Sequence, residues 1–236
     1  MIRSVLVLAV FFMIPVLLFG QTKSKKVPRP DLPGSFIFEF GFNQTSSKPA
    51  NFSQRFIGSN TINVIYQYPI RFGKSKFSFN PGIGFSFEKF KMKNTYTLTE
   101  TATSGQFQLE NVSKTYPGMK KSLIKNNYIE IPLEFRFDTK PEDIARSFNI
   151  AIGGRIGYLM DANTKIKYKE DGETRKAIDK QNHGMNPIRY GAYTRFGIGA
   201  FGLFTYYNIS PLFEKDKGPD KTTMNTFTVG ISINGL

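Results

Sequence analysis

Apolar and polar residues alternate with a period of two along most of the chain after residue 35. In the first such segment, Phe38 and Phe40 flank Glu39, and the same alternation returns at intervals up to the C-terminus. This pattern is typical of strands that have one apolar and one polar face. It predicts eight strands, at residues 35–43, 59–70, 76–89, 126–138, 147–160, 187–199, 202–210 and 223–235.

The connections between these predicted strands alternate in length. The short ones are 71–75, 139–146 and 200–201, and the long ones are 44–58, 90–125, 161–186 and 211–222. Tight turns at one end and long loops at the other are typical of outer-membrane β-barrels, whose short turns are periplasmic and whose long loops are extracellular. The predicted fold is therefore an all-β, eight-stranded antiparallel transmembrane β-barrel of outer-membrane type.

The composition of the two strand faces predicts which one lines the lumen. One face is a continuous wall of Phe, Ile and Tyr, which suits hydrocarbon, where closure of the barrel satisfies every backbone group. The other face carries Gly, Ser and Asn together with charges of both signs, and paired charges with small residues can fill a narrow lumen. We predict a structural charge cluster in the lumen, formed by Glu39, Glu88, Glu130, Glu134, Arg136, Arg155, Arg189 and Arg195.

A soluble barrel is the alternative to this orientation. A lipocalin-like protein packs its apolar face inward around a ligand and shows its polar face to water. For the membrane barrel, eight strands leave too little room for an open solute pore.

The N-terminal segment has the features of an export signal. Arg3 supplies a positive charge, the stretch from Val5 to Leu18 is apolar, and Gly20 precedes a plausible cleavage point at Gln21. A retained anchor helix is less well supported, because about 20 apolar residues are needed to cross a bilayer. The expected organisation is a signal peptide at 1–20, a basic, Pro-rich periplasmic tail at 21–34 and an outer-membrane barrel at 35–236.

Residue counts remove several kinds of chemistry. The chain has 24 Phe, 11 Tyr and 21 Gly but no Cys and a single His. A protein without Cys has no disulfide, no thiolate metal site and no thiol nucleophile, and one His excludes a multi-histidine metal centre. These counts argue against most enzyme classes, and we expect no catalytic residue, no cofactor and no metal site.

Two features invite an enzymatic interpretation. Residues 197–202 match G-x-G-x-x-G, but a strand-like sequence follows instead of the helix that a dinucleotide site requires, so a tight turn is the better interpretation. His183 lies in the 161–186 connection with no identifiable partner, and such a histidine is more often simply solvated. A small barrel enzyme that modifies outer-membrane lipid through His183 remains an alternative.

Positive charge dominates the chain. Lys and Arg number 32 against 18 Asp and Glu, which gives a net charge of +14. The excess lies in the N-terminal tail and in the long connections. The 90–125 connection contains Lys91, Lys93, Lys114, Lys120, Lys121 and Lys125. In an exported barrel these residues predict contact with outer-membrane lipid and anionic lipopolysaccharide, and not with nucleic acid.

One strand carries a family resemblance. The sequence Asn-Tyr-Ile-Glu-Ile-Pro-Leu-Glu-Phe at 127–135, with Tyr128, Glu130 and Pro132, resembles the Y-[IL]-E-I-P-L strand of the PorT-like outer-membrane β-barrel family. Ser-Pro-Leu-Phe at 210–213 and the closing segment 226–231 are similar to that family as well. One departure is the last residue, Leu236, because outer-membrane barrels usually end on an aromatic residue.

The resemblance implies a function that the residues themselves do not show. It implies a non-enzymatic accessory or assembly role in type IX protein secretion and gliding motility, with protein subunits of the secretion machine as partners. A structural or adhesive surface barrel that works through its loops is a further alternative.

Overall fold

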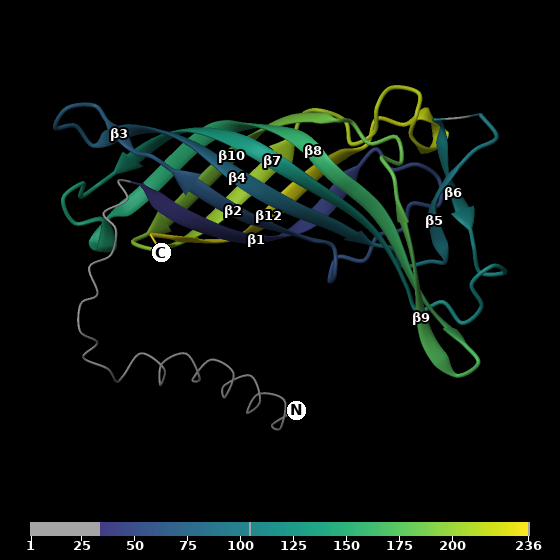
Figure 1. Ribbon diagram of the computed structural model, residues 1–236. Coiled ribbons are helices and arrows are strands. Elements are labelled where there is room, and N and C mark those ends of the chain that lie inside the picture. Colours follow the sequence, from purple (N-terminus) through teal and green to yellow (C-terminus); the bar gives the residue numbers. More distant parts are fainter. Residues whose placement is uncertain (1–33, 104, 236) are drawn as a thin grey trace. The chain divides into compact units, whose positions relative to one another are not determined.

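The computed structural model describes residues 34–103 and 105–235 (Figure 1). The predicted signal peptide and residues 21–33 of the predicted tail lie outside this range. The strands are β1 (Ser35–Ser46), β2 (Asn60–Gln67), β3 (Ile70–Arg71), β4 (Phe77–Lys91), β5 (Tyr96–Glu100), β6 (Phe107–Asn111), β7 (Lys121–Asp138), β8 (Phe148–Glu170), β9 (Glu173–Lys180), β10 (Ile188–Ile198), β11 (Phe201–Asn208) and β12 (Asn225–Asn234). Two short 3₁₀ turns, η1 (Ile144–Arg146) and η2 (Pro219–Lys221), complete the elements. In the part of the chain that the structure describes, no helix has the length and apolar character needed to cross a membrane.

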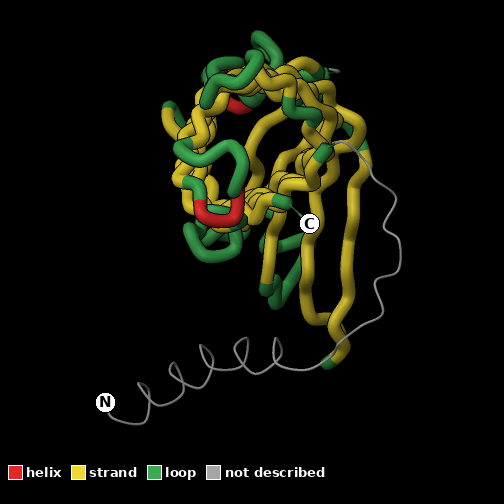
Figure 2. Tube along the Cα trace, turned by 90° about the vertical axis from the view of Figure 1, so that its left-hand side faces the viewer, coloured by secondary structure: helices red, strands yellow, loops and turns green. Residues whose placement is uncertain are grey.

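Eight of these strands close into an antiparallel barrel. The order around the barrel is β1, β2, β4, β7, β8, β10, β11 and β12, and β12 pairs back onto β1. The strands form a closed ring in Figure 2. The predicted eight-stranded antiparallel barrel is confirmed.

The outer face of the barrel is apolar. Large side chains such as Phe38, Phe85 and Ile131 are exposed on it, whereas Glu39 and Glu130, which neighbour two of them in sequence, are buried inside. A wall of exposed Phe and Ile around a closed barrel is the arrangement that hydrocarbon requires. The lipocalin-like alternative predicts the opposite orientation of both faces.

The long connections contain more strand than the sequence pattern predicted. β7 begins at Lys121 and β8 runs to Glu170, where the chain turns into β9, so the connection 161–186 is largely a hairpin. A second hairpin, β5–β6, lies within 90–125. The extensions of β7 and β8 were missed because their outward positions change from apolar residues to Lys, although the period of two continues.

The two ends of the barrel are built differently. At the end with short connections, β10 and β11 are joined by a two-residue turn whose first residue, Gly199, has a φ of 58°. At the other end the long connections fold over the barrel and bury an apolar cluster, which we call the outer cap. It consists of Phe52, Phe90, Met92, Leu98, Ile124, Tyr128, Leu159, Ala162, Met185, Leu212, Phe213 and Met224.

Candidate functional site

Charged side chains fill the centre of the lumen. The structure buries seven of the eight predicted residues there, and we call these seven the lumen cluster: Glu39, Glu88, Glu130, Glu134, Arg155, Arg189 and Arg195. They come from β1, β4, β7, β8 and β10, so residues that are distant in sequence meet because the barrel closes.

Glu39 and Arg155 form one part of the lumen cluster. Nη2 of Arg155 donates to the two carboxylate oxygens of Glu39, each at 2.8 Å. The amide of Asn63 donates to the same carboxylate at 2.8 Å, and Nη1 of Arg195 lies 3.7 Å from it. These partners compensate the cost of burying the Glu39 charge.

Glu134 and Arg195 form a second part. Nη2 of Arg195 lies 2.5 Å from the Glu134 carboxylate, to which the phenol of Tyr193 donates at 2.9 Å. The amide of Asn80 donates to the other carboxylate oxygen at 3.1 Å. Gln67 accepts a further hydrogen bond from Arg195 at 3.3 Å. These contacts link β2, β4, β7 and β10 through the lumen.

Glu130 and Glu88 share Arg189. Nε of Arg189 donates to Glu130 at 2.7 Å, and its Nη1 lies 3.9 Å from Glu88. The guanidinium also lies 3.9 Å from the centroid of the Tyr128 ring, which gives a favourable cation–π contact. The motif residues Tyr128 and Glu130 are therefore both contacts of one buried arginine.

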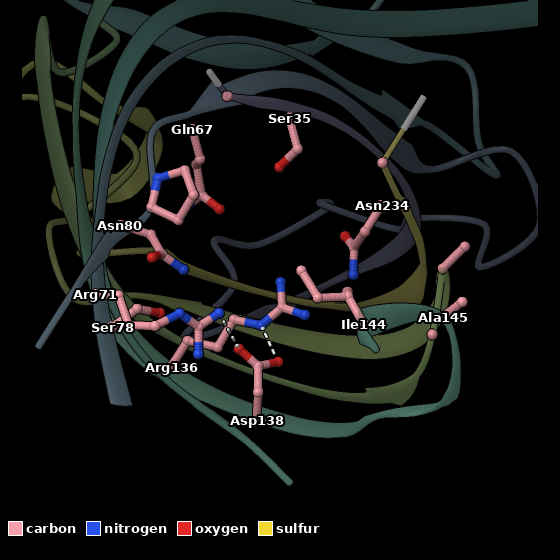
Figure 3. A pocket seen from close by; sticks show the side chains of 15 residues that line it. Ser35, Gln67, Arg71, Ser78, Asn80, Arg136, Asp138, Ile144, Ala145 and Asn234 are labelled. Atoms are coloured by element: carbon pink, nitrogen blue, oxygen red, sulfur yellow. Dashed lines mark hydrogen bonds and ion pairs between the residues drawn. The ribbon is translucent and has the colours of Figure 1, made fainter. Parts of the chain in front are cut away.

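Arg136, the eighth predicted residue, lies at the short-loop mouth of the barrel and not in the lumen cluster. Its Nε donates to Asp138 at 2.9 Å, and Arg71 lies 3.8 Å from the same carboxylate (Figure 3). Arg136 is two positions beyond Glu134 toward the end of β7, which brings its side chain to the mouth. Its partner Asp138 was not predicted, because it falls at the last position of a strand, where a charge usually marks the turn.

The mouth encloses a cavity of about 370 Å³ at the periplasmic end of the barrel. Polar residues from several strand ends line it, including Asn80 and Asn234 (Figure 3). Nη1 of Arg71 and Nη2 of Arg136 have no hydrogen-bond partner among the described residues. The cavity therefore presents two guanidinium groups and one carboxylate, an environment suited to a small polar or anionic group.

The lumen is closed at two levels. The lumen cluster fills its middle with paired charges and aromatic rings, and the outer cap seals the extracellular end with apolar side chains. Among the described residues, these two groups of buried side chains occupy the middle and the extracellular end of the lumen, in agreement with the narrow interior of eight-stranded barrels.

His183 is buried, contrary to the expectation that it is solvated. Its Nδ1 lies 2.6 Å from the carbonyl oxygen of Gln181, and its Nε2 lies 3.2 Å from the carboxylate of Asp179. Its ring packs beside that of Phe107 in β6. Tertiary folding brings the β5–β6 hairpin to this segment, so the residues next to His183 in sequence carried no signal of its burial.

The glycine-rich motif at 197–202 forms a tight turn, as its sequence predicts. Gly199 provides the positive φ of the β10–β11 turn, and Gly197 and Gly202 lie opposite each other in the two strands. A Cβ on Gly197 would overlap the carbonyl oxygen of Phe201, so only glycine permits this close approach of the strands.

Two aromatic residues that contact the lumen arginines were not predicted from the sequence. Tyr193 donates to Glu134 and stacks on Arg155 at 4.3 Å, and Tyr206 lies 5.5 Å from the same arginine. A signal was available for Tyr193, because it lies two residues from Arg195 and therefore on the same strand face. β11 is aromatic on both faces, so no such signal distinguished Tyr206.

Comparison with known protein families decides the classification of the chain. The family model described as the outer membrane protein beta-barrel domain matches residues 19–214. The chain belongs to this family. It is a multi-pass barrel of the outer membrane, where the apolar outer face described above contacts lipid.

Two solved structures are similar to this chain. Ail, the attachment invasion locus protein of Yersinia pestis, has 15% sequence identity and a TM-score of 0.37 over 86% of this chain and 99% of that chain. The N-terminal β-barrel domain of Pseudomonas aeruginosa OprF has 9% identity and a TM-score of 0.34 over 86% and 97%. A comparison with curated protein sequences gives no significant match.

Proposed function

We propose that this outer-membrane barrel is a non-enzymatic accessory or assembly component of the type IX protein secretion system, and that it supports protein secretion and gliding motility. The observation that carries the proposal is the closure of the lumen at two levels. A barrel closed in this way acts through its surfaces and not as a conduit. An accessory or assembly role requires only such surfaces.

The choice of secretion system rests on the PorT-like resemblance. Of the three motif residues, Tyr128 and Glu130 contact Arg189, and Pro132 is buried on the same inner face of β7. The motif therefore has a structural role in the lumen, and it supports the relationship to PorT-like barrels without forming a site of its own.

The proposed partners are protein subunits of the secretion machine. The periplasmic end supports this part of the proposal, because the mouth cavity with Arg71, Arg136 and Asp138 lies there. The predicted basic tail at 21–34 would add positive charge on the same side of the membrane. A periplasmic subunit with an acidic segment fits this charge.

The non-enzymatic assignment is part of the proposal. His183 is the residue on which the enzymatic alternative depends, and both of its ring nitrogens already have partners in Gln181 and Asp179. A general base needs one ring nitrogen directed at a substrate proton. The arrangement of His183 supports a role in holding the 173–183 segment in place.

Deletion of the gene from the source bacterium tests the proposal. We expect the culture medium to lose the proteins that depend on type IX secretion, while other outer-membrane proteins stay at their normal level. Re-expression of the wild-type barrel should restore secretion, whereas unrelated periplasmic proteins should not change in either strain. Normal type IX secretion in the deletion strain would overturn the proposal, and an altered lipid A structure would instead support the enzymatic alternative.

A further inference from the structure

Lysine side chains form an ordered array on the outer face of the barrel, at its extracellular end. The pairing register places them in rows across neighbouring strands. In the first row Lys89 of β4 is opposite Lys125 of β7, and in a later row Lys121 of β7 is opposite Lys167 of β8, which is opposite Lys176 of β9. Lys91, Lys165 and Lys180 also occupy outward positions of these strands, and we call these three and the five above the lysine patch. Lys169, next to the β8–β9 turn, has the same direction but is not counted in the patch.

The outward direction of the lysine patch follows from the strand period. Lys89 lies two residues beyond Phe87, which is exposed on the apolar outer face, whereas Glu88 between them is buried inside. On β8, two lysines of the patch flank the buried Ile166. The array is therefore part of the same surface as the apolar wall.

The distance of the lysines from the apolar wall indicates their position relative to the lipid headgroups. Two residues of strand span about 7 Å, so the first row begins about 7 Å beyond the last exposed Phe of β4. The lipid headgroups begin where the apolar side chains of a barrel end. The first row of the lysine patch consequently lies beside the headgroups of the outer leaflet, and the later row lies up to about 13 Å further out, four residues along β7.

The positive charge of the array is not neutralised by the protein. Across residues 34–103 and 105–235, none of the eight lysines has a carboxylate within 4.0 Å. The acidic residue on the same face below the first row, Asp161, instead accepts hydrogen bonds from the amides of Asn127 and Asn163 at 3.2 and 3.0 Å. Like charges opposite each other in a sheet destabilise it, and a bound external anion would offset this repulsion.

The neighbouring positive charges also lower the pKa of one lysine of the patch. Partial burial, together with the charges of Lys89, Lys91, Lys165 and Lys167, lowers the pKa of Lys121. Lys121 lies in the extracellular extension of β7, beyond the apolar wall. Its lowered pKa agrees with a site that favours a negatively charged neighbour.

We infer that the lysine patch binds the phosphate groups of outer-leaflet lipid, with the acyl chains of that lipid packed on the apolar wall below. Two observations select this ligand over a soluble anion or a protein. The patch is continuous with the lipid-facing wall, so a bound lipid contacts both surfaces at once. Its charge is complementary to phosphate, and the four neighbouring strands spread that charge over about 14 Å, which lets the patch contact more than one phosphate.

Lipid A is the phosphate-bearing lipid of lipopolysaccharide and provides the probe. The purified protein in dodecyl maltoside micelles is titrated with diphosphoryl lipid A and, separately, with lipid A from which both phosphates have been removed. Bound lipid is counted by native mass spectrometry. The test variant is K89Q/K121Q/K125Q/K167Q, and the matched control is K74Q/K76Q/K114Q/K140Q, whose four lysines are exposed and lie outside the patch. Both variants lose the same charge, and a heated-versus-unheated gel shift verifies that each one is folded.

We expect the patch variant to bind diphosphoryl lipid A at least about tenfold more weakly than the wild type, and the control to bind within about twofold of it. Dephosphorylated lipid A should bind weakly and equally to all three proteins. Equal binding of the two lipids by the wild type would overturn the inference, because the acyl chains alone would then account for binding. An equal loss in both variants would overturn it as well, because net charge and not the array would be responsible. The readout is lipid binding, so it does not depend on the secretion role proposed above.

Discussion

The charges of the lumen cluster are paired with one another inside the protein, whereas those of the lysine patch have no opposite charge from the described residues beside them. In the lumen cluster, the carboxylates of Glu39, Glu130 and Glu134 each have an arginine within 2.8 Å, and the surrounding protein excludes water. In the lysine patch, lysine faces lysine across the strands and no carboxylate of the described residues is close. The difference shows that the interior charges serve the stability of the closed barrel, whereas the exterior charges are left for a partner outside the protein.

The largest effect is expected from removing one charge of the lumen cluster. Arg189→Met leaves Glu130 and Glu88 without their cation in a buried site, which costs about 3–5 kcal/mol of unfolding free energy. Urea unfolding in detergent, followed by the gel shift, measures this loss. The double variant Arg189→Met/Glu130→Gln should recover part of it, because one of the unpaired charges is then gone. Equal losses in the single and double variants would contradict the claim that pairing maintains the interior.

A smaller loss is expected from overfilling the lumen without a change of charge. A Cβ on Gly41 would lie 2.6 Å from Cγ2 of Thr228 and 2.9 Å from Cζ of Phe204, so Gly41→Val should cost about 1–3 kcal/mol. Gly154, on the lipid-facing side of β8, is the control, because the contact found for its Cβ is at 3.6 Å. Gly154→Val should leave the urea midpoint nearly unchanged. A similar loss in both variants would show that the lumen is not tightly packed at Gly41.

A third prediction concerns the stability that the buried His183 gives to the segment around it. His183→Ala removes the contacts to Gln181 and Asp179, and we expect a loss of about 1–2 kcal/mol in the same unfolding assay. Because the backbone at His183 has a φ of 52°, His183→Asn is the control, since Asn tolerates this conformation better than Ala. Lipid A from cells that express either variant should have the same mass as lipid A from cells with the wild type. A change in that mass would favour the enzymatic alternative.

The smallest effect, of opposite sign, is expected in the lysine patch. Lys121→Gln removes repulsion with Lys167, so stability in a neutral detergent at low salt should rise by about 0.2–1 kcal/mol. The gain should largely disappear at about 0.5 M salt, because salt screens exposed charges. Lys74→Gln, at an exposed position outside the patch, should produce no gain. A loss of stability in Lys121→Gln would show that Lys121 makes a stabilising contact, and it would contradict the claim that no described carboxylate pairs with this lysine.

The pH dependence of the wild-type unfolding free energy gives a second test of the repulsion within the lysine patch. Because the pKa of Lys121 is lowered in the folded barrel, the unfolded chain binds more protons at alkaline pH. The contribution of Lys121 to stability therefore rises with pH between its lowered pKa and the ordinary lysine value of about 10.5. Subtracting the unfolding curve of Lys121→Gln from that of the wild type isolates this contribution, and a flat difference over this range would contradict it.

Local alternation was sufficient to predict which charged strand residues fill the middle of the lumen, although it did not identify Tyr206. Glu39, Glu130 and Arg195 were assigned to the polar face because side chains on a strand alternate strictly between its two faces. Alternation was not sufficient to predict partners. Nothing in the sequence around Arg155 indicates that it meets Glu39, which lies 116 positions away.

The strand extensions beyond the membrane show a second limit. The prediction that the strand now seen as β8 ends near residue 160 relied on apolar outward residues, and Lys165 and Lys167 replace them where the strand leaves the lipid. The pattern of apolar outward residues therefore indicates where a strand faces lipid, and not where the strand ends. The lysine patch became visible only once the register of β4, β7, β8 and β9 was known.

By itself, the sequence determined the eight strands, their antiparallel order, the lipid-facing wall and the polar character of the lumen, because each of these follows from the period of two and from connection length. Tertiary structure alone decided which carboxylates the lumen arginines meet, that Arg136 pairs with Asp138 at the mouth, and that His183 is buried beside the β5–β6 hairpin. The physical reason is that closure of the barrel brings distant strands into contact. Which charges then meet depends on register and shear, and these are properties of the whole sheet and not of any one strand.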